Sequence, residues 1–203
     1  MVAAVLAIGL AVAAALLLLL LSTLLGGIFR IWPTPGPGTW QSYVFWPLFR
    51  GLNALCFIVA LMEPAGYLGL PNWFRAVAML ALIASAALFI YAFHVLGRDN
   101  SYGAQDGLVT GGIYRWSRNP QNAMLIVVYG SLAIAKDGGG TYLLCAAMMA
   151  VYVLMVFCEE PWLERIYGES FRRYCRNVPR FFNSRRLLLL LQATAKRCGW
   201  KAN

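Results

Sequence analysis

The sequence predicts an all-α, polytopic helical membrane protein with about five transmembrane helices and C-terminal amphipathic helices. The first observation is composition: of 203 residues, 61% are hydrophobic and only 12% are charged, and the mean hydropathy is +0.64. A soluble domain of this length is far less apolar. The second observation is that the apolar residues fall into five closely spaced segments, which favours a single membrane-embedded domain over residues 1–203.

Most of the expected spans begin or end at residues that stop a helix or favour the membrane interface. The spans cover about 2–25, 42–62, 73–96, 120–135 and 141–158, and a cytoplasmic tail follows over 159–203. The first is an Ala/Leu/Val run without the basic start of a cleaved signal, so we expect it to be retained. The loop Pro33–Gly38 follows it, and Glu63-Pro64 ends the second span. His94, near the end of the third, is expected at the interface.

The fourth span is conspicuously short. Counted from Pro120 it has sixteen residues, about 24 Å at the helical rise, whereas the hydrocarbon core is about 30 Å thick. We therefore expect its start to lie below the headgroups, drawing Arg118 and Asn119 inward.

Basic residues set the expected orientation. Ten of the seventeen Lys and Arg follow Glu160, and with five spans Arg30, Arg98, Arg115 and Arg118 fall at the same end as this tail. The positive-inside rule then puts the C-terminus in the cytoplasm and the N-terminus outside. This distribution fits a membrane protein and argues against a nucleic-acid partner.

The tail is expected to be amphipathic. Apolar residues recur at helical spacing: Leu163, Ile166, Tyr167, Phe171, Tyr174 and Val178. Gly168 is expected to interrupt this helix and Pro179 to end it. The run Leu187–Leu191 is too short to span, so a second interfacial helix is expected there.

The longest polar interruption, residues 107–122, is one candidate site. Its second half crowds together Arg115, Arg118 and three side-chain amides. Pro120 suits the first turn of a helix and Asn119 its N-cap, where free N–H groups and the helix dipole favour an anion. A capped connector between two spans explains the same residues.

The carboxylate pair Glu159-Glu160, at the end of the fifth span, is the other candidate. Adjacent carboxylates beside a bilayer are costly unless paired or solvated, and Arg118 and Arg180 are candidate partners. A plain interfacial charge pair is the alternative. One histidine and five cysteines without paired spacing make a Ser/His/Asp arrangement or a metal centre improbable, so no metal is expected. The absence of a Gly-x-Gly-x-x-Gly motif excludes a dinucleotide-type domain.

At both sites the sequence resembles the superfamily of isoprenylcysteine carboxyl methyltransferases and phospholipid methyltransferases. Gly112-Ile113-Tyr114 followed by Arg118-Asn119-Pro120 resembles the family's loop. The C-terminal signature matches almost position for position, in Glu159-Glu160, Leu163, Tyr167-Gly168, Phe171, Tyr174 and Val178-Pro179-Arg180-Phe181. The similarity covers roughly residues 96–182, which is under half the chain.

The resemblance implies an integral membrane methyltransferase that uses S-adenosyl-L-methionine and acts on a hydrophobic or lipid-like acceptor, such as an isoprenylcysteine carboxylate. It also implies a cytoplasm-facing cofactor pocket and a tunnel open to the bilayer. The cofactor-binding residues carried over by position are Leu108, Val109, Gly112, Tyr114, Asn119, Pro120, Gln121, Asn122 and Glu160. The expected catalytic residues are Glu160, Glu159, Arg118 and Arg180.

The chain departs from the family pattern Arg-His-Pro-x-Tyr, because Asn119 and Asn122 replace the histidine and the tyrosine. An amide cannot carry a proton. Methyl transfer to a carboxylate needs no proton removal, whereas an amine acceptor would need Glu159 or Glu160 as a base. A catalytically degenerate membrane scaffold and a membrane reductase of related fold remain as alternatives.

Overall fold

The computed structural model describes residues 1–26, 29–97 and 107–182, and every regular element within these ranges is a helix. The helices are α1 (Val2–Leu24), α2 (Trp40–Met62), α3 (Asn72–Leu96), the short 3-10 helix η1 (Gly112–Arg115), α5 (Pro120–Lys136) and α6 (Gly139–Asn177). The predicted all-α class is confirmed. The last helix extends well past the expected end at Cys158. The predicted interfacial helix at Leu187–Leu191, and Arg98, lie outside the described residues.

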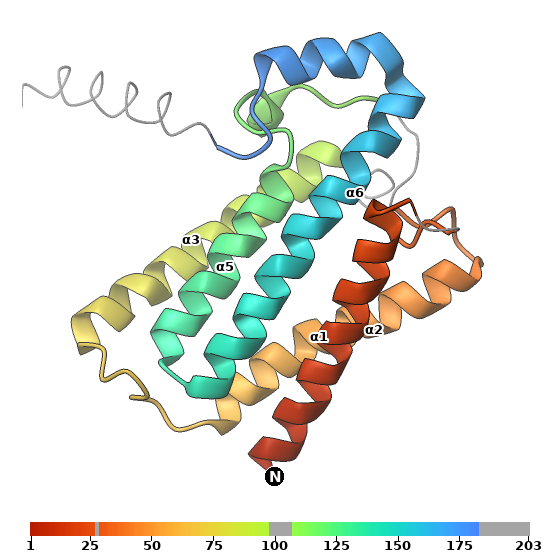
Figure 1. Ribbon diagram of the computed structural model, residues 1–203. Coiled ribbons are helices and arrows are strands. Elements are labelled where there is room, and N and C mark those ends of the chain that lie inside the picture. Colours follow the sequence, from red (N-terminus) through yellow and green to blue (C-terminus); the bar gives the residue numbers. More distant parts are fainter. Residues whose placement is uncertain (27–28, 98–106, 183–203) are drawn as a thin grey trace, which may run out of the picture.

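Among the described helices, α1, α2, α3 and α6 are long and apolar enough to cross a membrane. Helix α5 has 17 residues, about 26 Å at the helical rise, and is as short as the sequence indicated. It packs between α3 and α6 (Figure 1). Large apolar side chains on the outer face of α3 are exposed, including Leu80 and Ile83, as is typical of lipid-facing positions.

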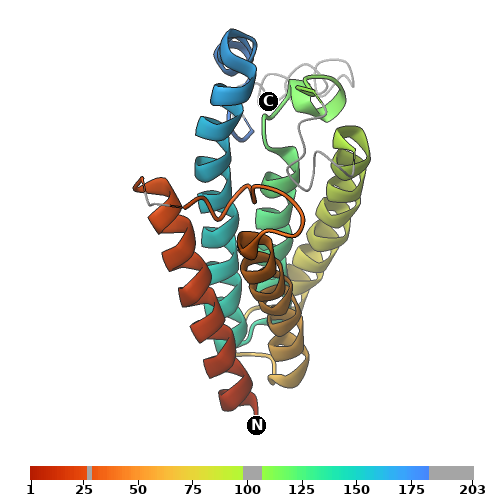
Figure 2. The ribbon, with the colours of Figure 1, turned by 90° about the vertical axis from the view of Figure 1, so that its right-hand side faces the viewer.

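Helix α6 is the centre of the bundle. It packs against α1, α2 and α5, whereas α3 packs mainly on α5 (Figures 1 and 2). Leu16, Leu52 and Val151 are fully buried between these helices. At Gly9 of α1 an added Cβ would lie 2.9 Å from Leu144 of α6. The missing side chain therefore allows a close approach of the two helices, as small residues do in membrane bundles.

At the end of the bundle that carries the N-terminus, two carboxylates tie the inter-helix loops together. Glu63, the C-cap of α2, accepts hydrogen bonds from the backbone N–H and the hydroxyl of Thr141, both at 2.8 Å. Asp137 accepts hydrogen bonds from the N–H groups of Leu68 and Leu70, at 2.9 and 3.0 Å. The first contact satisfies free N–H groups at the start of α6, where a negative charge is also favoured by the helix dipole.

At the opposite end, α6 bends at Gly168 (φ 52°, ψ −126°), and its last turns lie across η1 (Figure 1). Phe171 and Tyr174 form part of an apolar cluster that includes Leu108. The Tyr174 hydroxyl donates to the carbonyl of Tyr114 at 2.6 Å. The sequence correctly predicted the interruption at Gly168. The bend holds residues 107–118 against the bundle and forms the cavity described next.

Candidate active site

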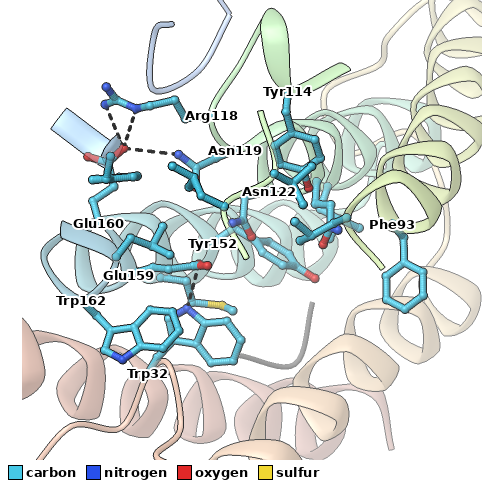
Figure 3. Close-up of a pocket in the computed structure, with 18 of the residues that line it drawn as sticks. Trp32, Phe93, Tyr114, Arg118, Asn119, Asn122, Tyr152, Glu159, Glu160 and Trp162 are labelled. Carbon is cyan, nitrogen blue, oxygen red and sulfur yellow. Dashed lines mark hydrogen bonds and ion pairs between the residues drawn. The ribbon is translucent and has the colours of Figure 1, made fainter. Parts of the chain in front are cut away.

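A cavity of about 340 Å³ lies where α2, α3, α5 and α6 meet residues 107–119 (Figure 3). Its polar end is lined by Arg118, Asn119, Glu159 and Glu160. Its remaining walls are largely apolar and include Trp46, Phe49, Phe89, Phe93, Leu125 and Met155. The site therefore combines a charged end with an apolar body, which suits an amphipathic ligand.

Glu160 is held between two arginines. Arg118 donates to Oε1 from Nη2 at 2.9 Å and from Nε at 3.2 Å, while Arg180 donates to Oε2 from Nη2 at 2.7 Å and from Nε at 2.9 Å. The side chains of Glu160 and Arg118 are each only 10% exposed. The hydrogen bond to Glu160 raises the pKa of Arg180 above its ordinary value. Through these ion pairs Glu160 joins the loop before α5, α6 and the segment after α6.

Asn119 supports this ion-pair network. It occupies the N-cap of α5 with Pro120 at the first turn, as predicted, but its side chain makes no capping hydrogen bond. Its Nδ2 donates instead to Glu160 Oε1 at 3.4 Å and to the carbonyl of Arg180 at 3.2 Å. The Ser117 hydroxyl accepts from the Asn119 backbone N–H at 3.1 Å. The amide thus joins the segment after α6 to the start of α5.

Glu159 is different from its neighbour. It follows Cys158, the last residue of the apolar run, and faces the cavity without an ion pair among the described residues. Its Oε2 accepts one hydrogen bond, from Trp32 Nε1 at 3.3 Å. Burial raises the pKa of Glu159 to about 7; the Trp32 hydrogen bond opposes this rise and the charge of Glu160 adds to it. A carboxylate in this state can bind a cation or accept a proton near neutral pH.

The cavity brings together most of the residues predicted from the sequence. Its lining includes Leu108, Val109, Tyr114, Arg118, Asn119, Gln121, Asn122, Glu159 and Glu160. Arg180 contacts Glu160 but is not among the lining residues, and neither are Gly112 and Pro120. Gly112 (φ 55°) begins η1 close to Val95 of α3, so its role is in the turn. Pro120 is buried as the first residue of α5.

Several lining residues were not predicted. Trp32 stacks on Phe45, with ring centroids 4.9 Å apart, and meets the edge of Trp46 at 5.9 Å. An aromatic residue in a proline-rich loop gives no signal of such a position. Asn53 of α2 could have been found, because a lone amide in an apolar span is costly without a partner. His94 is not among the lining residues, and within the described ranges no group of His, Cys, Asp or Glu is placed to hold a metal ion.

Comparison with known proteins identifies a related segment. Residues 73–170 match the family model described as phospholipid methyltransferase. The chain is 32% identical over 76 residues to proteins named phosphatidylethanolamine N-methyltransferase from Aspergillus terreus and Aspergillus clavatus. It is 27% identical over 135 residues to the protein of that name from Penicillium rubens.

These alignments cover 37% of this chain and 8% of the Aspergillus proteins, and 66% of this chain and 13% of the Penicillium protein. The chain thus spans a small fraction of the length of these curated relatives. No solved structure matches the chain significantly. The matched residues include nearly all of α3, all of α5 and most of α6, with Glu159 and Glu160 on α6 and Arg118 in the loop before α5. The resemblance found in the sequence is confirmed for residues 73–170: this segment of the membrane protein matches the phospholipid methyltransferase model and is similar to enzymes of the membrane methyltransferase superfamily.

Proposed function

We propose that the chain is an S-adenosyl-L-methionine-dependent methyltransferase that acts on the amine of a phosphatidylethanolamine-type lipid. The observation that carries this proposal is Glu159, a carboxylate without an ion pair among the described residues, which faces an apolar cavity. The match of residues 73–170 to the phospholipid methyltransferase model and the names of the relatives support the reaction type and the amine headgroup.

The polar end of the cavity fits a cofactor that carries a carboxylate and a cation. Asn122 lines the cavity, and its side chain makes no hydrogen bond with another described residue (Figure 3). It lies in the first turn of α5, where N–H groups have no acceptor within the helix and favour an anion. Asn122 and this turn would hold the cofactor's carboxylate, and the aromatic rings of Tyr114 and Trp162 would face its cationic part. When bound, S-adenosyl-L-methionine supplies a methyl group whose bond to sulfur breaks as the acceptor nitrogen takes it.

The amine must first lose a proton, because an ammonium has no lone pair. Glu159, ionised above a pH of about 7, attracts the ammonium and accepts its proton on a carboxylate oxygen. The Trp32 N–H orients this carboxylate, and Glu160 with its two arginines fixes the neighbouring backbone. Phe93, Leu125 and Met155 exclude water from the apolar side of the reacting groups. The proton then leaves Glu159 for solvent.

An isoprenylcysteine carboxylate is the less favoured acceptor. It requires no base, so the unpaired Glu159 would have no role in its methylation. It would also bring a second negative charge next to the unpaired Glu159, and like charges in a shielded site repel. Glu159, a carboxylate that faces the cavity without an ion pair among the described residues, therefore favours an amine acceptor.

Cofactor binding separates this proposal from the scaffold and the reductase. Titration calorimetry of the purified protein with S-adenosylhomocysteine should show binding, and titration with NADPH should show none. Asn122→Leu should weaken the binding of S-adenosylhomocysteine by about 1–3 kcal/mol, the usual consequence of losing a buried polar partner. Asn177→Leu, on an exposed surface, is the matched control and should bind normally. Binding of NADPH alone would support the reductase, and binding of neither compound the scaffold.

A further inference from the structure

Three polar side chains from three helices meet inside the apolar bundle. The hydroxyls of Tyr129 (α5) and Tyr152 (α6) both donate to Oδ1 of Asn53 (α2), the latter at 3.1 Å. Nδ2 of Asn53 donates to the carbonyl of Phe49 at 2.7 Å. Buried polar groups cost free energy unless they are hydrogen-bonded. A ligand that is pure hydrocarbon at this depth would have no use for polar side chains here.

This cluster retains hydrogen-bonding capacity on the side of the cavity. Asn53 and Tyr152 line the cavity, whereas Tyr129 is 2% exposed and is not among the lining residues. Asn53 has two amide hydrogens, and only one has an acceptor among the described residues. The remaining N–H is a donor for a neutral acceptor such as a carbonyl oxygen.

The cluster lies at a defined depth below the carboxylates. Tyr152 precedes Glu159 on α6 by seven residues, about 10 Å along the helix axis. Figure 3 shows Tyr152 and Asn122 facing the cavity between Glu159 and Phe93. In a glycerophospholipid with an ethanolamine headgroup, about nine bonds separate the amine nitrogen from an ester carbonyl carbon, which is about 11 Å when extended at the reach per bond of a backbone. The two lengths agree.

We propose that Asn53 and Tyr152 form a second subsite, which binds the ester carbonyl region of the phospholipid whose amine lies at Glu159. This inference rests on the proposed function and makes it more specific. Asn53 donates its spare N–H to the ester carbonyl. This contact positions the lipid so that its amine lies at Glu159, at the polar end of the cavity. A prenyl chain is pure hydrocarbon at this depth and gains nothing from the subsite.

Lipid binding without any methyl donor tests the subsite. The purified full-length protein in detergent is titrated with dioleoylphosphatidylethanolamine and with the diether lipid of the same headgroup and chain length, which lacks both carbonyls. The wild type should bind the diester about fivefold more tightly, the contribution of a typical hydrogen bond. Asn53→Leu removes the spare N–H and should lose this preference. Tyr152→Phe and Tyr129→Phe each remove one of the two hydrogen bonds to Asn53 Oδ1 but leave that N–H in place, so both should keep most of the preference.

Equal binding of diester and diether by the wild type would overturn the subsite, as would an undiminished preference in Asn53→Leu. Loss of the preference in Tyr129→Phe to the same extent would show that the cluster only joins the helices, and would also overturn it. If Asn53→Leu fails to fold, the wild-type comparison of diester with diether decides. A protein that shows the ester preference but methylates no amine would contradict the proposed function and leave the subsite standing.

Discussion

At the scale of residues, two adjacent glutamates have different surroundings. Successive residues on an α-helix point about 100° apart, so Glu160 meets Arg118 and Arg180 while Glu159 faces the cavity. Both oxygens of Glu160 accept hydrogen bonds from guanidinium groups, whereas Glu159 has one indole N–H. We therefore expect Glu160 to position the site and Glu159 to contact the reacting amine.

Replacing each glutamate should separate stability from activity. Glu160→Gln leaves Arg118 partly unpaired in a site that is 10% exposed, and should lower the free energy of unfolding by about 3 kcal/mol, as breaking a buried pair does. Glu159→Gln should keep the wild-type melting temperature and lose methyl transfer. Thermal unfolding in detergent measures the first effect. Glu164→Gln, whose pair with Arg172 is about half exposed, is the control and should not change it. An unaltered melting temperature for Glu160→Gln would contradict the positioning role.

The pH dependence should follow Glu159. Burial raises its pKa from 4.5 to about 7, and only the ionised form accepts a proton, so the initial rate with an amine lipid should rise as the pH passes through about 7. Trp32→Phe removes an N–H that stabilises the carboxylate and should move the midpoint to higher pH. Rates from pH 5.5 to about 9 would measure both midpoints. A wild-type midpoint near the ordinary carboxyl pKa, or no movement in Trp32→Phe, would exclude Glu159 as the base.

At the scale of elements, the bend of α6 determines whether a cavity exists. Gly168 has φ 52° and ψ −126°, a backbone conformation that is strained for residues with a side chain. The bend directs residues 169–177 over η1, where Phe171 and Tyr174 line the cavity. A straight continuation of α6 would carry both side chains away from Tyr114.

Gly168→Ala tests this bend. No atom lies within 4 Å of an added Cβ, so any effect comes from backbone strain and not from a clash. The variant should be destabilised by about 1–3 kcal/mol and should bind S-adenosylhomocysteine more weakly. Gly36→Ala is the control, because Gly36 also has open space and no left-handed φ. Equal melting temperatures and affinities for the two variants would show that the bend does not require glycine.

The elements were more predictable from the sequence than the site. Apolar runs of the right length identify the spanning helices, and Gly168 and Pro120 locate the bend and the start of α5. The local sequence also indicated the two glutamates and Arg118. It could not indicate Trp32, because this residue reaches the cavity only through the packing of the linker that carries it. The N-cap position of Asn119 was predicted, but its bond to Glu160 depends on tertiary contacts.

At the scale of the whole molecule, basic residues are concentrated at one end. Arg118 and Arg180 lie at the cavity end together with most of the other described Lys and Arg, whereas Arg75 and Lys136 lie at the end with the N-terminus. The positive-inside rule predicts that the cavity end faces the cytoplasm. A site in this position would meet a water-soluble methyl donor from the cytoplasm and a lipid from the surrounding leaflet.

Cysteine labelling tests this orientation. Pro37→Cys, in the linker at the cavity end, and Leu68→Cys, in the loop at the other end, are both exposed positions. In a background whose accessible native cysteines are replaced by serine, an impermeant thiol reagent added to intact cells should label only Leu68→Cys. Labelling of Pro37→Cys alone would show the opposite orientation.

The central claim is that this chain transfers a methyl group to a lipid amine and that Glu159 accepts the proton. The most direct measurement is mass spectrometry of dioleoylphosphatidylethanolamine after incubation with deuteromethyl-labelled S-adenosyl-L-methionine and the purified protein. We expect the label on the headgroup nitrogen with the wild type and almost none with Glu159→Gln. An unlabelled amine together with a labelled prenylcysteine carboxylate, or equal amine labelling by the two proteins, would contradict the claim.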